Sequence, residues 1–394
     1  MKNIFKLLAF LPLLTACDDL FEPALENNRD LEAMYKEPSY AQGILANAYI
    51  ILPYETSPTS DLATDDAVTN EISSNYLRMA TGSWTANNNP VSQWQNRFNA
   101  IQYINLFLEN VDKVEWAKDE RISTMFLDRL KGEAYGLRAL HMYYLLRAHG
   151  GKIADGTLMG VPIILKSEGP DADFNHARAT YSDCVKQIME DADKAIELLP
   201  LDYKKFADSE IPEKYKNIGV TNASDYRRVC GEEYRGLMSG RIALAVRAQT
   251  ALLAASPAFQ SGSGMTWEQA ADYAAEIIEK ANGGGGCGLD ADGLEWYTLA
   301  DKDYGTGGSP AEVIWRSSTD DNNTLETANF PPSLYGNGRV NPTQNLVDAF
   351  PMANGYPISE TSGNYDAENP YDNRDPRLAK YIVYNGSKQG PSDT

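Results

Sequence analysis

The sequence is poor in histidine, in basic residues and in long hydrophobic runs. Its 394 residues include three histidines and four cysteines, and 35 basic side chains face 55 acidic ones, which gives a net charge of −20. So few histidines leave little room for imidazole catalysis or imidazole metal sites. A field this negative repels phosphate and anionic lipid, which argues against nucleic-acid binding and against a basic membrane-binding patch.

Aromatic and apolar residues, in contrast, are plentiful. The chain has 23 tyrosines and six tryptophans, and 43% of its residues are hydrophobic. This apolar content can offset the entropy of folding, so we expect a globular protein of two or three domains or one large one. Tyrosine and tryptophan supply flat amphipathic surfaces, which suit neutral ligands as well as a protein core.

The N-terminus has the pattern of an export signal. A basic start at Met1–Lys6 precedes an apolar run at Leu7–Leu14 that is too short to span a bilayer. Small residues then lead to Cys17, as in a bacterial lipobox, so we predict a signal peptide at 1–16 and lipidation of Cys17. The alternative is a plain secretory signal with an incidental cysteine. Cleavage would leave 33 basic and 55 acidic side chains and a charge of −22.

Hydrophobic residues along most of the chain recur at helical spacing. We expect Thr180 to cap one helix, and Gly132 and Gly136, four residues apart, to let a neighbouring helix approach closely. The periodicity predicts helices over 39–51, 94–111, 122–148, 180–199, 240–255 and 267–281.

Alanine-rich helix pairs of this kind predict a mainly α fold, a scaffold of stacked pairs similar to tetratricopeptide units, although no strict 34-residue repeat is present. Long polar loops at 53–90, 204–239 and 283–310 interrupt it, and loops of such length are commonly functional or disordered. Short strands are predicted at 312–315 and 381–384.

The sequence contains no complete motif of an enzyme or cofactor site. The glycines at 283–288 follow a helix instead of a strand, so they do not form a dinucleotide-binding loop, and 290–293 lacks the flanking acids of a calcium loop. Adjacent carboxylates such as Asp65 and Asp66 are expected by chance among 55 acids. We expect no cofactor, no metal site and no catalytic residues. The histidines are interpreted as structural: His141, His149 and His176.

The remaining cysteines predict no disulfide framework. Cys184, Cys230 and Cys287 are odd in number and irregularly spaced. A bridge from Cys184 to Cys230 is possible, but Cys184 lies in a helical pattern, where a buried free thiol is the more common state.

Several short motifs occur in an order that resembles a known family. They are 94–105 (WQNRFNAIQYIN), 132–140 (GEAYGLRAL), 177–181 (ARATY), 240–245 (GRIALA), 254–259 (AASPAF), 341–350 (NPTQNLVDAF) and 373–378 (NRDPRL). Together with the lipobox, this order resembles the SusD/RagB family of outer-membrane lipoproteins of Bacteroidota over essentially the whole chain.

The resemblance implies a surface lipoprotein, on a tetratricopeptide-like scaffold, that binds oligosaccharides and delivers them to a SusC-like TonB-dependent transporter in the outer membrane. The domains would be a signal peptide at 1–16, a lipidated tether at 17–38, the helical region at 39–310 and the start of the family's C-terminal region at 311–394. Family members continue past the Asp-Pro-Arg motif, so we expect the chain to be truncated. Two alternatives are a peptide-binding RagB-like lipoprotein and a surface glycoside hydrolase.

Sugar binding would use aromatic rings in the polar loops, because a sugar's C–H face packs on a ring while amide, carboxylate and guanidinium groups bond its hydroxyls. The expected platforms are Tyr76, Trp84, Trp296, Tyr297 and Tyr304, and the expected hydrogen-bonding residues are Asp66, Arg78, Asn87 and Asn88. Pinning its loop to the helices is an equal alternative for Trp84 and Trp296. We expect Trp94, Trp267 and Trp315 to pack in the core.

Overall fold

The computed structural model describes residues 31–53, 60–85, 87–280, 312–317 and 322–388. The helices are α1 (Pro38–Ile50), α2 (Asn75–Ala80), α3 (Trp94–Asn110), α4 (Glu120–His149), α5 (Tyr181–Leu198), α6 (Glu213–Lys216), α7 (Ala223–Cys230), α8 (Gly240–Ala255), α9 (Gln260–Ser263), α10 (Trp267–Lys280), α11 (Thr324–Asn329), α12 (Gln344–Ala349) and α13 (Pro376–Tyr381). The strands are β1 (Ala67–Val68), β2 (Gly151–Lys152), β3 (Leu158–Met159) and β4 (Asn341–Pro342), in the antiparallel pairs β1–β4 and β2–β3.

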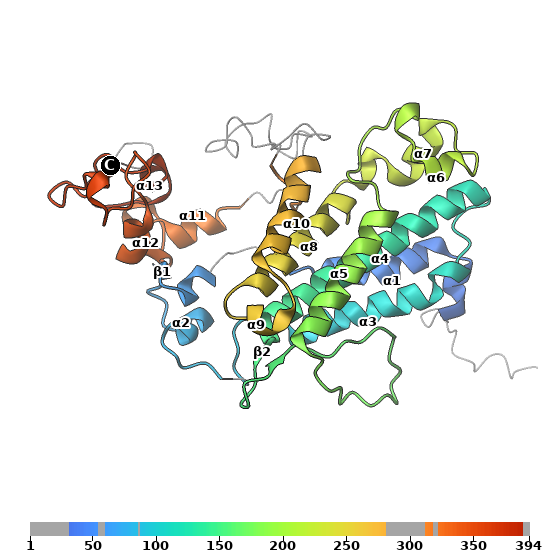
Figure 1. The fold of residues 1–394 in the computed structure, drawn as a ribbon, viewed down its shortest axis with the longest axis horizontal. Coiled ribbons are helices and arrows are strands. Elements are labelled where there is room, and N and C mark those ends of the chain that lie inside the picture. Colours follow the sequence, from blue (N-terminus) through green and yellow to red (C-terminus); the bar gives the residue numbers. More distant parts are fainter. Residues whose placement is uncertain (1–30, 54–59, 86, 281–311, 318–321, 389–394) are drawn as a thin grey trace, which may run out of the picture.

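The long helices pack side by side into one helical body. Helices α1, α3, α4, α5, α8 and α10 pack in chain order, each against the next, which confirms the mainly α, stacked-pair prediction (Figure 1). Side-chain caps fix several helix starts: the oxygens of Asp119, Thr180 and Ser239 accept backbone N–H bonds at the starts of α4, α5 and α8. The expected cap at Thr180 is therefore confirmed.

Two glycines of α4 permit close contact with the elements packed against it. A Cβ atom at Gly132 would lie 3.0 Å from Leu198 Cβ on α5, and one at Gly136 would lie 3.3 Å from Ala195 Cβ on α5 and 2.6 Å from Met238 Cγ just before α8. Both glycines are buried in α4. The prediction that this pair allows close packing is confirmed, because any larger residue would displace a neighbouring side chain.

A buried ion pair joins the three central helices. Arg138 on α4 donates to both carboxylate oxygens of Asp191 on α5, from Nε at 2.7 Å and from Nη2 at 2.8 Å, and its Nη1 donates to Asn105 Oδ1 on α3 at 3.0 Å. All three residues are buried. Each helix therefore supplies one part of a polar cluster that fixes how the helices sit against one another.

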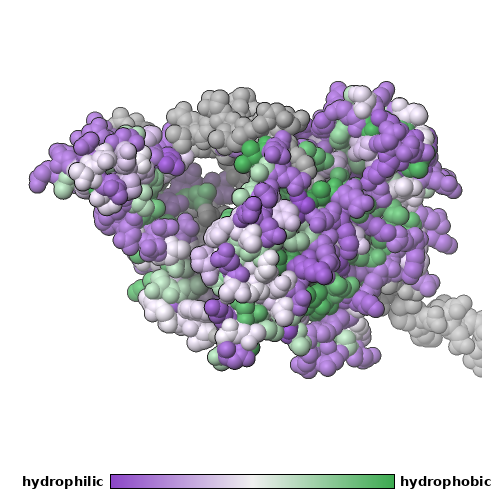
Figure 2. Space-filling model, in the orientation of Figure 1, coloured by the Kyte–Doolittle hydropathy of each residue, from purple (hydrophilic) through white to green (hydrophobic). Residues whose placement is uncertain are grey.

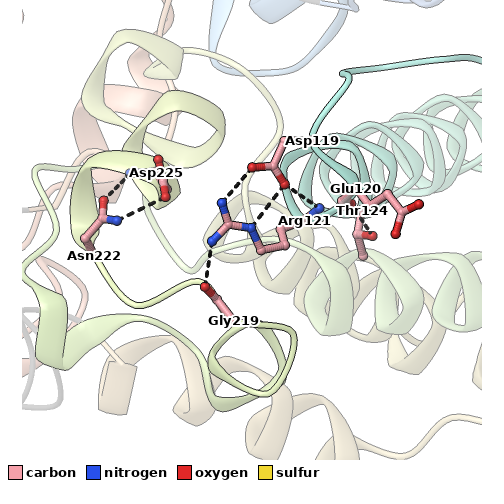
Figure 3. A network of polar contacts seen from close by, with 7 residues as sticks. All are labelled: Asp119, Glu120, Arg121, Thr124, Gly219, Asn222 and Asp225. Carbon is pink, nitrogen blue, oxygen red and sulfur yellow. Dashed lines mark hydrogen bonds and ion pairs between the residues drawn. The ribbon is translucent and has the colours of Figure 1, made fainter.

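Residues 204–238 form an insert with its own small core against the start of α4. Ile211, Tyr215, Val220, Tyr226, Val229 and Cys230 pack on Ile122 and Met125. At the rim, Arg121 donates to the Gly219 carbonyl at 2.8 Å and forms a bidentate pair with Asp119 (Figure 3). The Arg121 guanidinium lowers the pKa of Asp119 to about 2.

The C-terminal lobe (residues 322–388) lies apart from the long helices, and the surface is hollowed between this lobe and α8 and α10 (Figure 2). Arg374, from the Asn-Arg-Asp-Pro-Arg motif, is buried and donates to the carbonyls of Pro370, Val347 and Phe350 at 2.8, 2.7 and 2.7 Å. Asp375 caps α13. The motif thus closes the lobe around its small core of Val347, Leu378 and Ile382.

Both strands predicted near the C-terminus were wrong. Residues 313–317 have no regular structure, and Tyr381 is the last residue of α13. The Asp375 cap and the following proline start α13, which takes up Tyr381, and residues 382–384 pair with no strand although Ile382 packs in the core of the lobe. The structure instead places its C-terminal strand at β4, paired with β1 from the first long loop.

Two of the three tryptophans expected in the core are exposed. Trp94 is 40% exposed and Trp267 is 48% exposed, and each is the first residue of its helix, where fewer neighbouring turns cover the side chain. Trp315 is half-buried against the main core, and its Nε1 donates to the Gly236 carbonyl at 2.8 Å. Trp116, in contrast, is buried.

The described cysteines agree with the sequence analysis. Cys184 and Cys230 are free thiols, and both are buried, as expected for Cys184. Burial raises the pKa of both thiols, to about 12 for Cys230, so they are not reactive thiolates near neutral pH. Cys287 lies outside the described residues. Among the helices that the structure describes, none is long and apolar enough to cross a membrane.

Candidate functional site

The predicted binding residues that the structure describes all belong to the first long loop. Tyr76, Arg78, Trp84, Asn87 and Asn88 fall in or just after α2, and Asp66 precedes them beside β1. Trp296, Tyr297, Tyr304 and the lipidation site Cys17 lie outside the described residues. The candidate site is therefore built from one loop and from the elements that hold it.

Hydrogen bonds fold the residues after α2 into a tight loop. The Arg78 carbonyl accepts from Ser83 N at 2.8 Å and from Ser83 Oγ at 3.2 Å. Thr85 and Asn88 form an isolated antiparallel bridge, in which Asn88 N donates to the Thr85 carbonyl at 2.9 Å. Trp84 sits inside this framework and remains 47% exposed, so the loop presents its ring instead of burying it.

Two of the expected hydrogen-bonding side chains contact each other. Arg78 Nη1 donates to Asn88 Oδ1 at 3.1 Å and closes the loop that carries Trp84. Asn87, between the bridge residues, is exposed. Arg78 and Asn88 therefore position the loop, and the guanidinium and the Asn88 amide have further N–H donors besides this bond. Tyr76 is half-buried on α2.

Asp66 lies where the first long loop meets the C-terminal lobe. Its carbonyl accepts from Thr343 N at 2.8 Å, and the Thr343 hydroxyl bonds the Asp65 carbonyl. Four residues on, Asn70 Nδ2 donates to the Asn337 carbonyl at 3.1 Å, and Asn70 Oδ1 accepts from Arg339 at 3.1 Å. Sequence reasoning did not single out Asn70 or Arg339, because residues 267 or more positions apart carry no local signal of contact.

The histidines are structural, as the sequence analysis expected. His141 is buried between Arg97 Nη1 at 3.1 Å and the Ala48 carbonyl at 3.1 Å, and burial with the nearby Arg97 charge lowers its pKa to about 3. His149 accepts from Gln93 N at 3.0 Å. His176 pairs with Glu168 at 2.6 Å.

Within the part of the chain that the structure describes, no group of three or more histidine, cysteine, aspartate or glutamate side chains is placed to hold a metal ion. The buried carboxylate Glu133 on α4 accepts a hydrogen bond from Tyr49 at 2.7 Å and pairs with Arg129, so it belongs to the core. The surface of the Trp84 loop therefore presents an exposed indole together with amide and guanidinium groups. Groups of these kinds bind neutral polar ligands well.

Two family models match this chain. The model described as "Starch-binding associating with outer membrane" matches residues 25–214, and the model described as "SusD family" matches residues 311–392. The chain belongs to the SusD/RagB family. The resemblance seen in the motifs is thereby confirmed. No curated protein matches the sequence significantly.

Solved structures share the fold of this SusD/RagB chain. A SusD-like protein of Bacteroides fragilis has a TM-score of 0.63 at 18% identity, over 93% of this chain and 64% of that one. A SusD-like carbohydrate-binding protein of the same species has a TM-score of 0.60 at 20% identity, over 90% and 61%. A SusD superfamily protein of Bacteroides vulgatus has a TM-score of 0.54 at 18% identity, over 80% and 62%. The chain thus spans less than two thirds of the length of these relatives.

Proposed function

We propose that this protein is a cell-surface lipoprotein that binds oligosaccharides and passes them to a SusC-like TonB-dependent transporter in the outer membrane. One observation carries the proposal: in a member of the SusD/RagB family, a tight loop presents the half-exposed ring of Trp84 beside Arg78, Asn87 and Asn88. An indole face packs on the C–H face of a sugar, and the surrounding amides bond its hydroxyls.

The charge of the protein supports a neutral ligand. With a net charge of −20, the surface gains nothing from an anionic partner, whereas an uncharged glycan is not repelled. A carbohydrate-binding relative with the same fold is consistent with this ligand class. We infer that the protein acts by binding alone, because its sequence carries none of the catalytic motifs considered above.

Affinity measurements on the loop variant test the proposal. We expect Trp84→Ala to weaken binding at least about tenfold to whichever soluble polysaccharide the wild type binds, measured by isothermal titration calorimetry. Trp267→Ala is the matched control, because Trp267 is equally exposed but lies on α10. Trp296→Ala, alone and combined with Trp84→Ala, tests the second predicted platform. Unchanged affinity in all of these variants would refute the proposed site.

Further measurements separate the alternatives. A peptide panel that binds where every glycan fails would favour a RagB-like peptide-uptake role, and cleavage of a bound glycan would favour a hydrolase. Incorporation of a labelled fatty acid that is lost in Cys17→Ser tests the lipid anchor. Co-purification with an outer-membrane β-barrel transporter from the native host tests the delivery role.

A further inference from the structure

The long loop between β3 and α5 is anchored on α3 at its start. Gln102 of α3 binds the backbone of Glu168 in both directions, because its Nε2 donates to the Glu168 carbonyl and its Oε1 accepts from Glu168 N, each at 2.9 Å. Glu109, two turns further along α3, accepts from Ser167 N at 2.8 Å and from the Ser167 hydroxyl at 2.5 Å. These side chains fix the path of the loop as far as Glu168.

Beyond this anchor, residues 169–175 extend away from the helical body (Figure 1). Within the part of the chain that the structure describes, the hydrogen bonds of this segment stay inside it. Ala172 N donates to the Gly169 carbonyl at 3.1 Å, and Asn175 donates to Asp173 Oδ1 from its backbone N at 2.9 Å and from Nδ2 at 3.0 Å. The segment is exposed apart from Ala172, so packing contributes little to its position.

One ion pair joins the two ends of this segment. His176 Nε2 lies 2.6 Å from Glu168 Oε1, and the two side chains are 34% and 18% exposed. These two residues bracket 169–175, so their contact closes the loop. Two residues further on, Arg178 donates to the His149 carbonyl at 2.7 Å and fixes the chain on its way to α5.

The His176 ring faces two carboxylates. Glu168 contacts it directly, and Asp173 lies near enough for its pKa to be affected: hydrogen bonds from Asn175 lower the pKa of Asp173, and the charge of His176 lowers it further. The other titratable or charged side chains along the loop, on the stretch of α3 that anchors it and at the adjoining end of α4 are Glu109, Arg147, His149, Lys166, Asp171 and Arg178. Both acids stay ionised near neutral pH, so the charge of His176 decides the strength of the contact.

We propose that the pair of His176 and Glu168 is a pH-sensitive latch, which holds residues 169–175 closed while His176 is protonated and releases them when it becomes neutral. The proposal goes beyond ligand binding and does not depend on it. Histidine is the side chain that changes its charge between about pH 5 and pH 8, and a hydrogen bond between two charged groups is about twice as strong as a neutral one. The anchor on α3 keeps its bonds over this range, so only the far end of the loop responds.

Limited proteolysis with chymotrypsin measures the opening. Phe174 is 63% exposed inside the segment, and a protease that cleaves after aromatic residues must first draw the loop out into an extended strand. We expect cleavage after Phe174, identified from the fragment masses, to be about 3- to 10-fold faster at about pH 8 than at about pH 5.5. Each rate is divided by that of a free peptide of residues 169–178 at the same pH, which removes the pH dependence of the protease.

Two replacements of His176 should have opposite effects. His176→Gln cannot become charged, so its loop should be cleaved rapidly at both pH values, whereas His176→Arg is always charged and should be cleaved slowly at both. Glu168→Gln should lose the pH dependence as His176→Gln does. Asp171→Asn is the matched control, because Asp171 is an exposed acid of the same loop whose carboxylate forms no hydrogen bond to a described residue, and it should behave like the wild type.

The latch would be overturned if the wild-type loop were cleaved at the same corrected rate at both pH values. Persistence of the full pH dependence in His176→Gln would also overturn it, because the titrating group would then lie elsewhere. Thermal midpoints of the variants, expected within about 2 °C of the wild type, show that faster cleavage reflects local opening. If Glu168→Gln failed to fold, the contrast between His176→Gln and His176→Arg would still decide the matter.

Discussion

Asp191 accepts hydrogen bonds from both Nε and Nη2 of the buried Arg138 side chain, so its replacement should be costly. Side-chain exposures are 6% for Arg138 and 0% for Asp191, and the two hydrogen bonds measure 2.7 and 2.8 Å. In Asp191→Asn the carboxylate charge is lost and an amide NH₂ faces the guanidinium. Removing one partner of a buried pair costs about 3–5 kcal/mol, because the other charge stays buried without compensation.

This loss is large compared with the whole stability of a typical protein, about 5–15 kcal/mol. We expect urea denaturation of Asp191→Asn, followed by circular dichroism, to show the midpoint lowered with an unchanged slope. The thermal midpoint should fall by about 4–6 °C. The double variant Arg138→Met with Asp191→Leu should recover most of the loss, because it leaves no buried charge.

Glu190, the neighbour of Asp191 on α5, provides a matched control. It pairs with Lys186 at 3.9 Å, and the two side chains are 49% and 75% exposed. Glu190→Gln should therefore change the free energy of unfolding by less than about 0.5 kcal/mol. If Asp191→Asn behaved like this control, with a loss below about 1 kcal/mol, the reasoning that the pair organises α3, α4 and α5 would be refuted.

Three further predictions concern other parts of the fold. Gly136→Ala should destabilise the protein by about 1–3 kcal/mol in urea denaturation, because the added methyl group enters occupied space, whereas Gly43→Ala in α1, with nothing within 4 Å, should stabilise it by about 0.5–1 kcal/mol. His141 has a folded-state pKa of about 3, below its ordinary value, so the native state binds fewer protons than the unfolded state. Stability should fall by about 2 kcal/mol between pH 6.5 and pH 4.5 through this group, and His141→Gln should remove that part of the pH dependence. Arg374→Met should make the C-terminal lobe more sensitive to limited proteolysis, since three carbonyls lose their donor, while Arg377→Met, at a side chain 54% exposed, should leave it resistant.

Of the two loops predicted to bind sugar, the candidate site is built from the one that carries Trp84, because the predicted residues of the other lie outside the described residues. Local sequence was enough to single out Trp84, because an aromatic residue in a polar loop stands out from its neighbours. It was not enough to show that Arg78 and Asn88 bond each other, since that contact depends on how the loop closes after α2.

The sequence by itself determined the long helices, several of their caps and the close approach at Gly132 and Gly136. These features arise from periodicity and from local chemistry that operates within a few residues. The family membership was also readable from the order of short motifs. Only tertiary structure decided which tryptophans are exposed, that the residues at 381–384 do not form a strand, and that Asn70 reaches Arg339 across the chain. Such outcomes depend on which surfaces meet, and a contact between residues hundreds of positions apart leaves no periodic trace in the sequence.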